Sequence, residues 1–308
     1  MRWRAATGEP GDTTAGQRAA VAGSVVVVGD DALVAFDRAT GARRWRFAPR
    51  DGGYAVGSYL GAATASLVYV GGRGGRLYAV DPETGRARWS ASVVDDAALS
   101  TVFDPVLQGD VLVATFTVFT TPNRGGVIAL DARTGGTRWR VEFPPAQAQR
   151  HANAGGGPAV TEQLVLATRG DGVIHAFDRR TGVLAWTLPG VEGGVVPFTQ
   201  DARPLAVAGR WLVAGSTSGV VVAYDLASRR EQWRYTGQLG SVAFAIVADE
   251  RAVYVPYVGG RLVALAVGTG AERWRMGDAA LGFVWPPLLH ADRLYVAGSG
   301  AGFYALRR

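Results

Sequence analysis

Short apolar segments alternate with Gly-, Asp- and Thr-containing stretches along the whole chain. Four of the apolar segments are Leu67–Val70, Val111–Ala114, Leu164–Ala167 and Leu294–Ala297. Runs of this length that are rich in Val, Leu and Tyr and are bounded by turn residues predict β-strands. Segments with helical periodicity are scarce, and no apolar run has the length of a membrane-spanning helix. The pattern therefore predicts an all-β protein.

A motif of the form Ala-x-Asp-x-x-Thr-Gly-x-x-x-Trp follows several of these segments. The four complete copies contain Ala35, Asp37, Thr40, Gly41 and Trp45; Ala79, Asp81, Thr84, Gly85 and Trp89; Ala129, Asp131, Thr134, Gly135 and Trp139; and Ala176, Asp178, Thr181, Gly182 and Trp186. Two weaker copies follow them. One keeps Ala223, Asp225 and Trp233 but has Ser228-Arg229 in place of Thr-Gly, and the other keeps Ala264, Thr269, Gly270 and Trp274 but has Ala266 in place of Asp.

Successive Trp positions from Trp45 to Trp274 are separated by 44, 50, 47, 47 and 41 residues. A period of this size is typical of the four-stranded blade of a β-propeller. Within each copy we expect a strand, a tight turn at Asp-x-x-Thr-Gly, and a returning strand that carries the Trp. Gly supplies positive φ at the turn, while the Asp and Thr oxygens accept hydrogen bonds from turn amides. The indole is expected to wedge between neighbouring blades, with the small Ala opposite it.

The two ends of the chain together predict a seventh blade. Phe303–Leu306 matches the third strand of a repeat, but the chain ends before the corresponding turn and Trp. Arg2-Trp3-Arg4 matches a returning strand, and Trp3 lies 42 residues before Trp45. Pairing of the two ends would close the ring and remove exposed sheet edges. We therefore expect one seven-bladed propeller domain over residues 1–308, its last blade shared between residues 1–5 and 279–308.

The motif at this spacing resembles the quinoprotein, or PQQ-like, repeat along nearly the whole chain. The family includes PQQ-dependent alcohol dehydrogenases, the propeller lipoprotein of outer-membrane protein assembly, and sensor domains of bacterial kinases. The dehydrogenases are about twice as long, usually have eight blades and commonly carry an adjacent cysteine pair near the quinone, whereas this sequence has no Cys. The resemblance thus implies the fold without dehydrogenase activity, and we expect neither bound PQQ nor another cofactor.

Composition narrows the functional classes further. Without Cys, disulfides, thiolate metal sites and cysteine nucleophiles are excluded, and three scattered His residues form no metal-binding spacing. The net charge is +6, and the sequence contains Arg but no Lys. The Arg residues recur beside acidic residues rather than in a run, which disfavours nucleic acid as a partner. We expect a monomer without a membrane span, cytoplasmic if residue 1 is the native start and exported if a leader has been removed.

The segments between blades, together with the loops between the second and third strands of a blade, are the predicted location of a binding site, because propeller ligand faces carry these loops. The longest insertions are 117–126, 141–157 and 187–204. Residues expected to line an aromatic mouth with a few polar groups are Tyr54, Tyr59, Phe103, Asp104, His151, Asn153, Phe198, Asp201, Phe244, Phe283 and Trp285. Such a composition suits a small-molecule pocket. The alternative is that these aromatic side chains plug the axial channel or cover the blades.

Other polar residues have simpler interpretations. His175 replaces an apolar residue of a third strand, so packing explains it, and His290 belongs to a short turn. Asp95 and Asp96 could bind a cation, but in a loop they are more often solvated. Arg169-Gly170-Asp171 contains an adhesion-like tripeptide at a position where the other repeats have a turn.

Two functional hypotheses remain from the sequence. We favour a non-catalytic module that holds a small molecule, protein or peptide at its loop face, because the repeats are regular and no catalytic motif is present. The alternative is an enzyme of the cyclase or lyase type that acts on an apolar small molecule of secondary metabolism. In that case His151, Asp104 and Asp201 are the candidate acids and bases.

Overall fold

The structure is a computed structural model. It describes residues 18–29, 32–51, 54–55, 59–94, 100–120, 123–144, 154, 156–189, 191, 204–237, 242, 245–277, 287–290, 292–298 and 302–308. Within these residues every regular element is a β-strand, as the alternation of apolar and turn segments predicts. The chain divides into two compact units, Met1–Phe143 and Pro144–Arg308.

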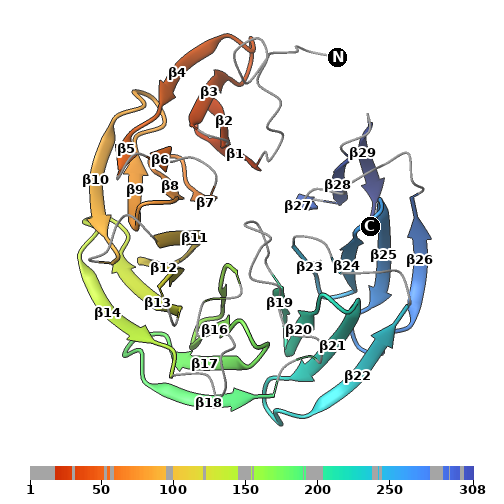
Figure 1. The fold of residues 1–308 in the computed structure, drawn as a ribbon. Coiled ribbons are helices and arrows are strands. Elements are labelled where there is room, and N and C mark those ends of the chain that lie inside the picture. Colours follow the sequence, from red (N-terminus) through yellow and green to blue (C-terminus); the bar gives the residue numbers. More distant parts are fainter. Residues whose placement is uncertain are drawn as a thin grey trace. The chain divides into compact units, whose positions relative to one another are not determined.

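The first unit contains three four-stranded antiparallel sheets, here called blades 1 to 3 (Figure 1). Blade 1 consists of β1 (Arg18–Ala22), β2 (Val25–Gly29), β3 (Leu33–Asp37) and β4 (Arg43–Phe47). Blade 2 consists of β7 (Tyr59–Ala63), β8 (Val68–Gly71), β9 (Arg76–Val80) and β10 (Ala87–Ser92). Blade 3 consists of β11 (Ser100–Gln108), β12 (Val111–Val118), β13 (Arg124–Asp131) and β14 (Thr137–Glu142). A small ribbon of β5 (Arg50–Asp51) and β6 (Tyr54–Ala55) lies between blades 1 and 2 in the sequence.

Apolar side chains join the blades of this unit face to face. Val27 and Ala35 of blade 1 share a cluster with Val70 and Tyr78 of blade 2, and Trp45 packs against it. Blades 2 and 3 share a second cluster, which contains Tyr69, Leu77, Leu112, Phe116 and Ile128. The core of the unit therefore lies between sheets, as expected for blades that cannot bury an apolar face alone.

The second unit contains blades 4 to 7. Blade 4 consists of β15 (Ala159–Val160), β16 (Leu164–Thr168), β17 (Ile174–Asp178) and β18 (Leu184–Leu188), and blade 5 of β19 (Leu205–Ala208), β20 (Trp211–Gly215), β21 (Val220–Asp225) and β22 (Glu231–Thr236). Blade 6 consists of β23 (Val247–Ala248), β24 (Ala252–Tyr257), β25 (Arg261–Ala266) and β26 (Glu272–Met276). Blade 7 has three described strands, β27 (Leu288–His290), β28 (Arg293–Gly298) and β29 (Gly302–Arg307). Three apolar clusters join blades 4 and 5, blades 5 and 6, and blades 6 and 7.

The register of the paired strands explains why each repeat combines a small Ala with a large Trp. In all six repeats the Ala pairs directly with the Trp of the returning strand, from Ala35↔Trp45 to Ala264↔Trp274. A register shift on the turn side of this pair marks a β-bulge in each hairpin, which increases the local twist of the outer strand. The small residue thus lies opposite the large one, as the repeat predicts.

Closure of the ring by the chain ends stays a prediction. The predicted third strand Phe303–Leu306 is found within β29. The complementary segment Arg2-Trp3-Arg4 lies outside the described residues, so its pairing with β29 is not tested. The assignment of residues 1–308 to one domain stays a prediction for the same reason.

Candidate functional site

The eleven residues predicted to line the mouth divide into three groups. For Tyr54 and Tyr59 the structure describes the backbone, which lies in β6 and β7. Phe103 and Asp104 are described with their side chains. The other seven lie outside the described residues: His151, Asn153, Phe198, Asp201, Phe244, Phe283 and Trp285. Convergence of the predicted acids and bases on one mouth therefore stays a prediction.

Phe103 and Asp104 lie in a buried strand rather than in a loop. Both belong to β11, where Phe103 is 7% exposed and Asp104 is fully buried. Asp104 has φ of 26° and lies at a bulge, because the pairing of β11 with β12 shifts between Phe103 and Val106. We expected both residues in a segment between blades. Asp-Pro usually marks a turn, but here it lies within a strand. Pairing with β12 on both sides of the bulge overrides this local preference.

Backbone packing encloses this part of β11 from the side of blade 2. A Cβ atom at Gly61 would lie 2.1 Å from the carbonyl oxygen of Pro105, and one at Gly71 would lie 2.5 Å from that of Val102. Only glycine permits so close an approach of two backbones. The surroundings of β11 within blade 3 are partly polar, since Thr101 pairs with Thr117 of β12 and both are buried. Neither face of β11 presents Asp104 to solvent.

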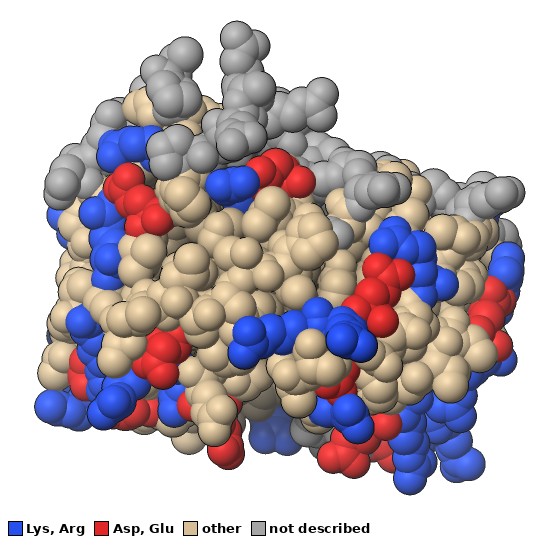
Figure 2. Space-filling model, turned by 90° about the horizontal axis from the view of Figure 1, so that it is seen from below, with Lys and Arg blue, Asp and Glu red and all other residues tan. Residues whose placement is uncertain are grey.

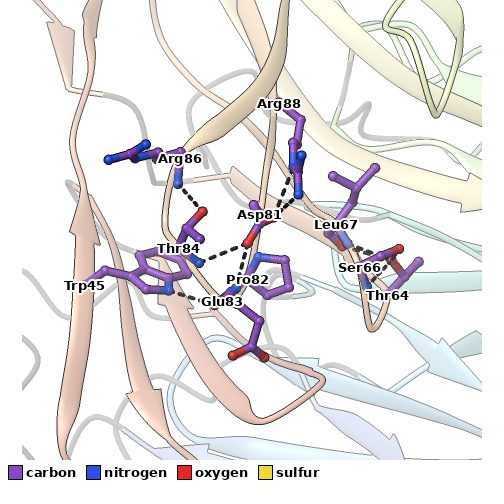
Figure 3. Close-up of polar contacts among 10 residues, drawn as sticks. All are labelled: Trp45, Thr64, Ser66, Leu67, Asp81, Pro82, Glu83, Thr84, Arg86 and Arg88. Atoms are coloured by element: carbon purple, nitrogen blue, oxygen red, sulfur yellow. Dashed lines mark hydrogen bonds and ion pairs between the residues drawn. The ribbon is translucent and has the colours of Figure 1, made fainter.

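The best-defined polar site is the Asp-x-x-Thr-Gly turn, shown for blade 2 in Figure 3. Oδ1 of Asp81 accepts hydrogen bonds from the amides of Glu83 at 3.0 Å and Thr84 at 2.9 Å. Its Oδ2 accepts from the Arg88 guanidinium at 2.5 and 3.0 Å. The Thr84 amide and the Arg88 side chain favour the ionised carboxylate, and they hold the pKa of Asp81 below its ordinary value against the opposing effect of burial.

Other turns use their carboxylates in the same way. The pKa of Asp131 falls to about 2, because Arg138, the Thr134 hydroxyl and the Thr134 amide all donate to the carboxylate. Asp37 and Asp178 accept from the equivalent amides and Thr hydroxyls. These carboxylates bind the turn itself, which supports the architectural interpretation of the motif.

The turns of blades 2, 3 and 6 also bind the Trp of the preceding blade. The indole Nε1 of Trp45 donates to Pro82 O at 2.7 Å, and Trp89 donates to Ala132 O at 3.1 Å. The turn glycine lies against the same ring, since a Cβ at Gly85 would be 2.6 Å from Trp45 ring carbons. In the second unit the Trp233 indole donates to Val267 O at 2.8 Å, and Gly270 lies on its ring. The motif is therefore a docking device between successive blades.

The two weaker repeats preserve this device by different means. In blade 5 Arg229 occupies the glycine position with φ of 59°, and its guanidinium lies 5.9 Å from the centre of the Trp186 ring. In blade 6 Ala266 has no carboxylate, and the turn keeps the backbone hydrogen bond that the other repeats also make, from the Gly270 amide to the Ala266 carbonyl oxygen at 2.8 Å. Sequence reasoning identified both departures from the motif but not the cation–π contact that accompanies the first.

The other singled-out residues have structural roles where they are described. His175 is 2% exposed and stacks on Phe177 at 6.1 Å, and burial lowers its pKa. Within the predicted turn, Arg169 bonds to Asp171 at 2.5 to 3.0 Å and to Pro144 O at 3.1 Å. The tripeptide is therefore folded on itself. Asp95 and Asp96 lie outside the described residues, and of His290 only the backbone, in β27, is described.

In the described residues, neither the charged side chains nor the possible metal ligands indicate one particular binding site. On the face shown in Figure 2, Arg and acidic side chains lie next to one another. Arg138–Asp131 and Arg275–Glu272 are examples of ion pairs in the protein. Over the described ranges, no group of three or more His, Cys, Asp or Glu residues could hold a metal ion. A helix long and apolar enough to cross a membrane is absent from the same part of the chain.

Comparison with known proteins places this architecture among propellers. The outer membrane protein assembly factor BamB of Yersinia pestis is 23% identical over 270 residues, which are 83% of this chain and 66% of that protein. The quinohemoprotein alcohol dehydrogenase ADH IIB of Pseudomonas putida is 34% identical over 198 residues, 60% of this chain but 26% of the enzyme. The chain thus spans just under two thirds of the first relative and about a quarter of the second.

A solved structure supports the fold. The crystal structure of BamB from Moraxella catarrhalis matches 94% of this chain and 87% of its own with a TM-score of 0.64, at 21% identity. The fold of the present chain is an all-β, seven-bladed propeller with four-stranded antiparallel blades, three strands of the last blade being described.

A family model described as outer membrane protein assembly factor BamB matches residues 1–116 and 94–308, which together span the sequence. These matches agree with the repeat identified from the residues. The chain belongs to this BamB-like family of PQQ-type repeat propellers.

Proposed function

We propose that this protein is a non-catalytic scaffold that binds a protein or peptide partner at the loops between its blades. The main support is the chemistry of the repeat. Asp81 and Asp131 bind turn amides and Arg side chains, so these recurring carboxylates are occupied within their own turns and offer no reactive surface. What remains variable is the set of inter-blade segments, where binding residues of repeat folds usually lie.

The relatives support a protein partner over a redox cofactor. The Yersinia relative is named an assembly factor, and 83% of this chain aligns with it. The alcohol dehydrogenase aligns over only 26% of its length, so most of that enzyme has no counterpart in the match. We therefore propose a partner that belongs to an envelope protein assembly. The acid–base enzyme gains no support, because Asp104 is fully buried in β11 and its proposed companions His151 and Asp201 lie outside the described residues.

The test replaces loop segments and leaves the scaffold intact. In one variant residues 145–153 become a Gly/Ser linker of equal length, and in another residues 192–203 do. The matched control, R133A/R180A, removes two exposed charges from turns of blades 3 and 4. Purified proteins are used to capture partners from cells of the source organism, with quantitative mass spectrometry as the readout.

We expect one or a few envelope proteins to bind the unaltered chain and the control but to be lost from at least one loop variant. Equal capture by all four proteins would contradict the loop assignment. A rise in melting temperature with the small-molecule fraction of the extract, without any captured protein, would contradict the protein partner.

A further inference from the structure

The outer strand of blade 4 differs from every other described outer strand in its charge. Among the described strands β18 is the last in the order β15-β16-β17-β18, so one side of its backbone has no described strand beside it and forms the edge of this sheet. Its sequence is Leu-Ala-Trp-Thr-Leu, without a charged residue. The corresponding strands each carry at least one Arg: β4 is RRWRF, β10 ARWSAS, β14 TRWRVE, β22 EQWRYT and β26 ERWRM. Charged side chains are a common means by which proteins keep sheet edges from pairing with other chains.

The turn that leads into β18 adds exposed apolar surface to this edge. Val183 is 65% exposed and Leu184 is 47% exposed. They are the only two neighbours in sequence among the exposed large hydrophobic residues of the described chain, which are Val21, Phe119, Val183, Leu184, Val258 and Leu288. Ala185 and Thr187 are exposed as well. Blade 4 therefore combines an uncharged edge with an apolar corner.

The sequence of β18 is compatible with pairing to itself. Antiparallel pairing of two copies centred on Trp186 would set Leu184 opposite Leu188 and Ala185 opposite Thr187. No like charges meet in this arrangement. The same operation would oppose Arg44 with Arg46 in β4, Arg138 with Arg140 in β14 and Arg273 with Arg275 in β26, and like charges directly opposite one another are destabilising.

We propose that β18 is a docking edge for β18 of a second copy of this chain. The two copies would share a two-fold axis at Trp186, and their fourth blades would form one continuous eight-stranded sheet. An interface of this kind uses the same patch on both copies and satisfies outward-facing N–H and C=O groups of each strand. It departs from the monomer expected from the sequence, and it is independent of the loop-based function proposed above.

The test restores to β18 the charge that other outer strands carry. In A185R/T187R each new Arg stands next to Trp186, as Arg138 and Arg140 stand next to Trp139 in β14. Both sites are exposed, so the fold should persist, which circular dichroism would verify. The matched control is A87R/S90R, which adds the same charge at exposed positions of β10.

Sedimentation equilibrium over a wide concentration range gives the readout. The unaltered chain and the control should rise from 32.3 kDa toward twice that mass as concentration increases. A185R/T187R should remain at the lower mass, with dimer affinity reduced by roughly tenfold or more, equivalent to about 1.4 kcal/mol. Amides of β18 should exchange more slowly with deuterium as concentration rises in the unaltered chain and in the control, but not in A185R/T187R.

Three outcomes would overturn the proposal. The first is a mass of one chain at every concentration. The second is a dimer that A185R/T187R weakens no more than the control does. The third is loss of the dimer in both variants, which would assign the effect to net charge instead of to this edge. Since none of these measurements involves the loop segments, failure here would leave the proposed partner binding untouched.

Discussion

The turns of blades 3 and 6 differ by one carboxylate but dock an indole in the same way. Blade 3 has Asp131, which accepts turn amides and an Arg, whereas blade 6 has Ala266 at that position. In both, a Gly of positive φ lies on the preceding Trp ring, and a backbone carbonyl accepts the indole N–H. The comparison indicates that glycine and the carbonyl make the joint between blades, while Asp stabilises the turn that presents them.

The largest loss of stability is expected from a substitution in the part that the two turns share, the glycine that lies on the Trp ring. In Gly135→Ala the new Cβ would lie 2.6 Å from the Trp89 ring at a φ of 74°. Left-handed backbone costs about 1–2 kcal/mol and overpacking about 1–3 kcal/mol, so we expect a loss of roughly 3 kcal/mol in the free energy of unfolding. Urea denaturation measures it. Gly209→Ala is the control, because its φ is 57° but nothing lies within 4 Å of the added Cβ; equal losses at the two positions would contradict the docking role.

A smaller effect should follow from the part in which the turns differ. Asp81→Ala removes the acceptor for two amides and the partner of Arg88, and caps of this kind are worth about 1–2 kcal/mol. The reverse substitution, Ala266→Asp, should raise the free energy of unfolding by about 0.5–1 kcal/mol by supplying the missing acceptor. Thermal and urea unfolding of both variants would decide. If Ala266→Asp is destabilising, the turn of blade 6 has adapted to the absence of the carboxylate.

Arg229→Gly in blade 5 should change stability least among the substitutions. Glycine relieves a left-handed conformation worth about 1 kcal/mol, but the contact of Arg229 with Trp186 is lost, at a cost of about 0.5–1 kcal/mol. The net change should therefore stay within about 1 kcal/mol of zero. Near-ultraviolet circular dichroism, which reports on the indole environment, should change even where the unfolding midpoint does not. A loss comparable to that of Gly135→Ala would mean that Arg229 is a main anchor of the joint.

Low pH should destabilise the turn of blade 3, which has a carboxylate, but not the turn of blade 6, which lacks one. The folded pKa of Asp131 is about 2, below the ordinary 3.8, so its contribution is complete above pH 4 and is lost as the pH falls through 2. Protection of the Thr134 amide against hydrogen exchange, corrected for the intrinsic rate, should fall over this range. Protection of the Thr269 amide, which faces no carboxylate at position 266, should stay constant. Parallel loss at both amides would indicate unfolding of larger parts instead.

The strands and turns were predictable because the repeat combines strong local signals with a regular period. Leu164–Ala167 was expected as a strand and forms most of β16, and the pairing of Ala with Trp followed from their sizes. The location of Asp104 was not predictable in this way, because Asp-Pro is a turn signal and only pairing with β12 keeps it in a strand. Arg229 could not be predicted for the same reason, since no local sequence preference places Arg in a left-handed backbone conformation.

The candidate site could be predicted only as a set of loop residues. Insertions such as 187–204 are longer than the loops that a bare propeller scaffold needs, and this indicates where a binding site could lie. They lack the periodicity that fixes the position of a strand. His151 and Asp201 were selected for their chemistry alone. The uncharged edge of β18, in contrast, was visible in the sequence as the absence of Arg on both sides of Trp186, and comparison of the repeats position by position could have found it.

The direction of the indole bonds has a consequence for how the molecule is made. Trp45, Trp89 and Trp233 are each bound by the turn of the blade that follows them in the sequence. On the ribosome, each of these blades therefore emerges with its ring uncovered and stays so until roughly forty more residues have been synthesised, the length of one repeat. A nascent chain would always present its newest aromatic surface to chaperones, and loss of residues from the carboxyl end would recreate that exposure of an indole. Loss from the amino end would instead uncover the apolar face of the next blade and the carbonyl that had accepted the indole N–H.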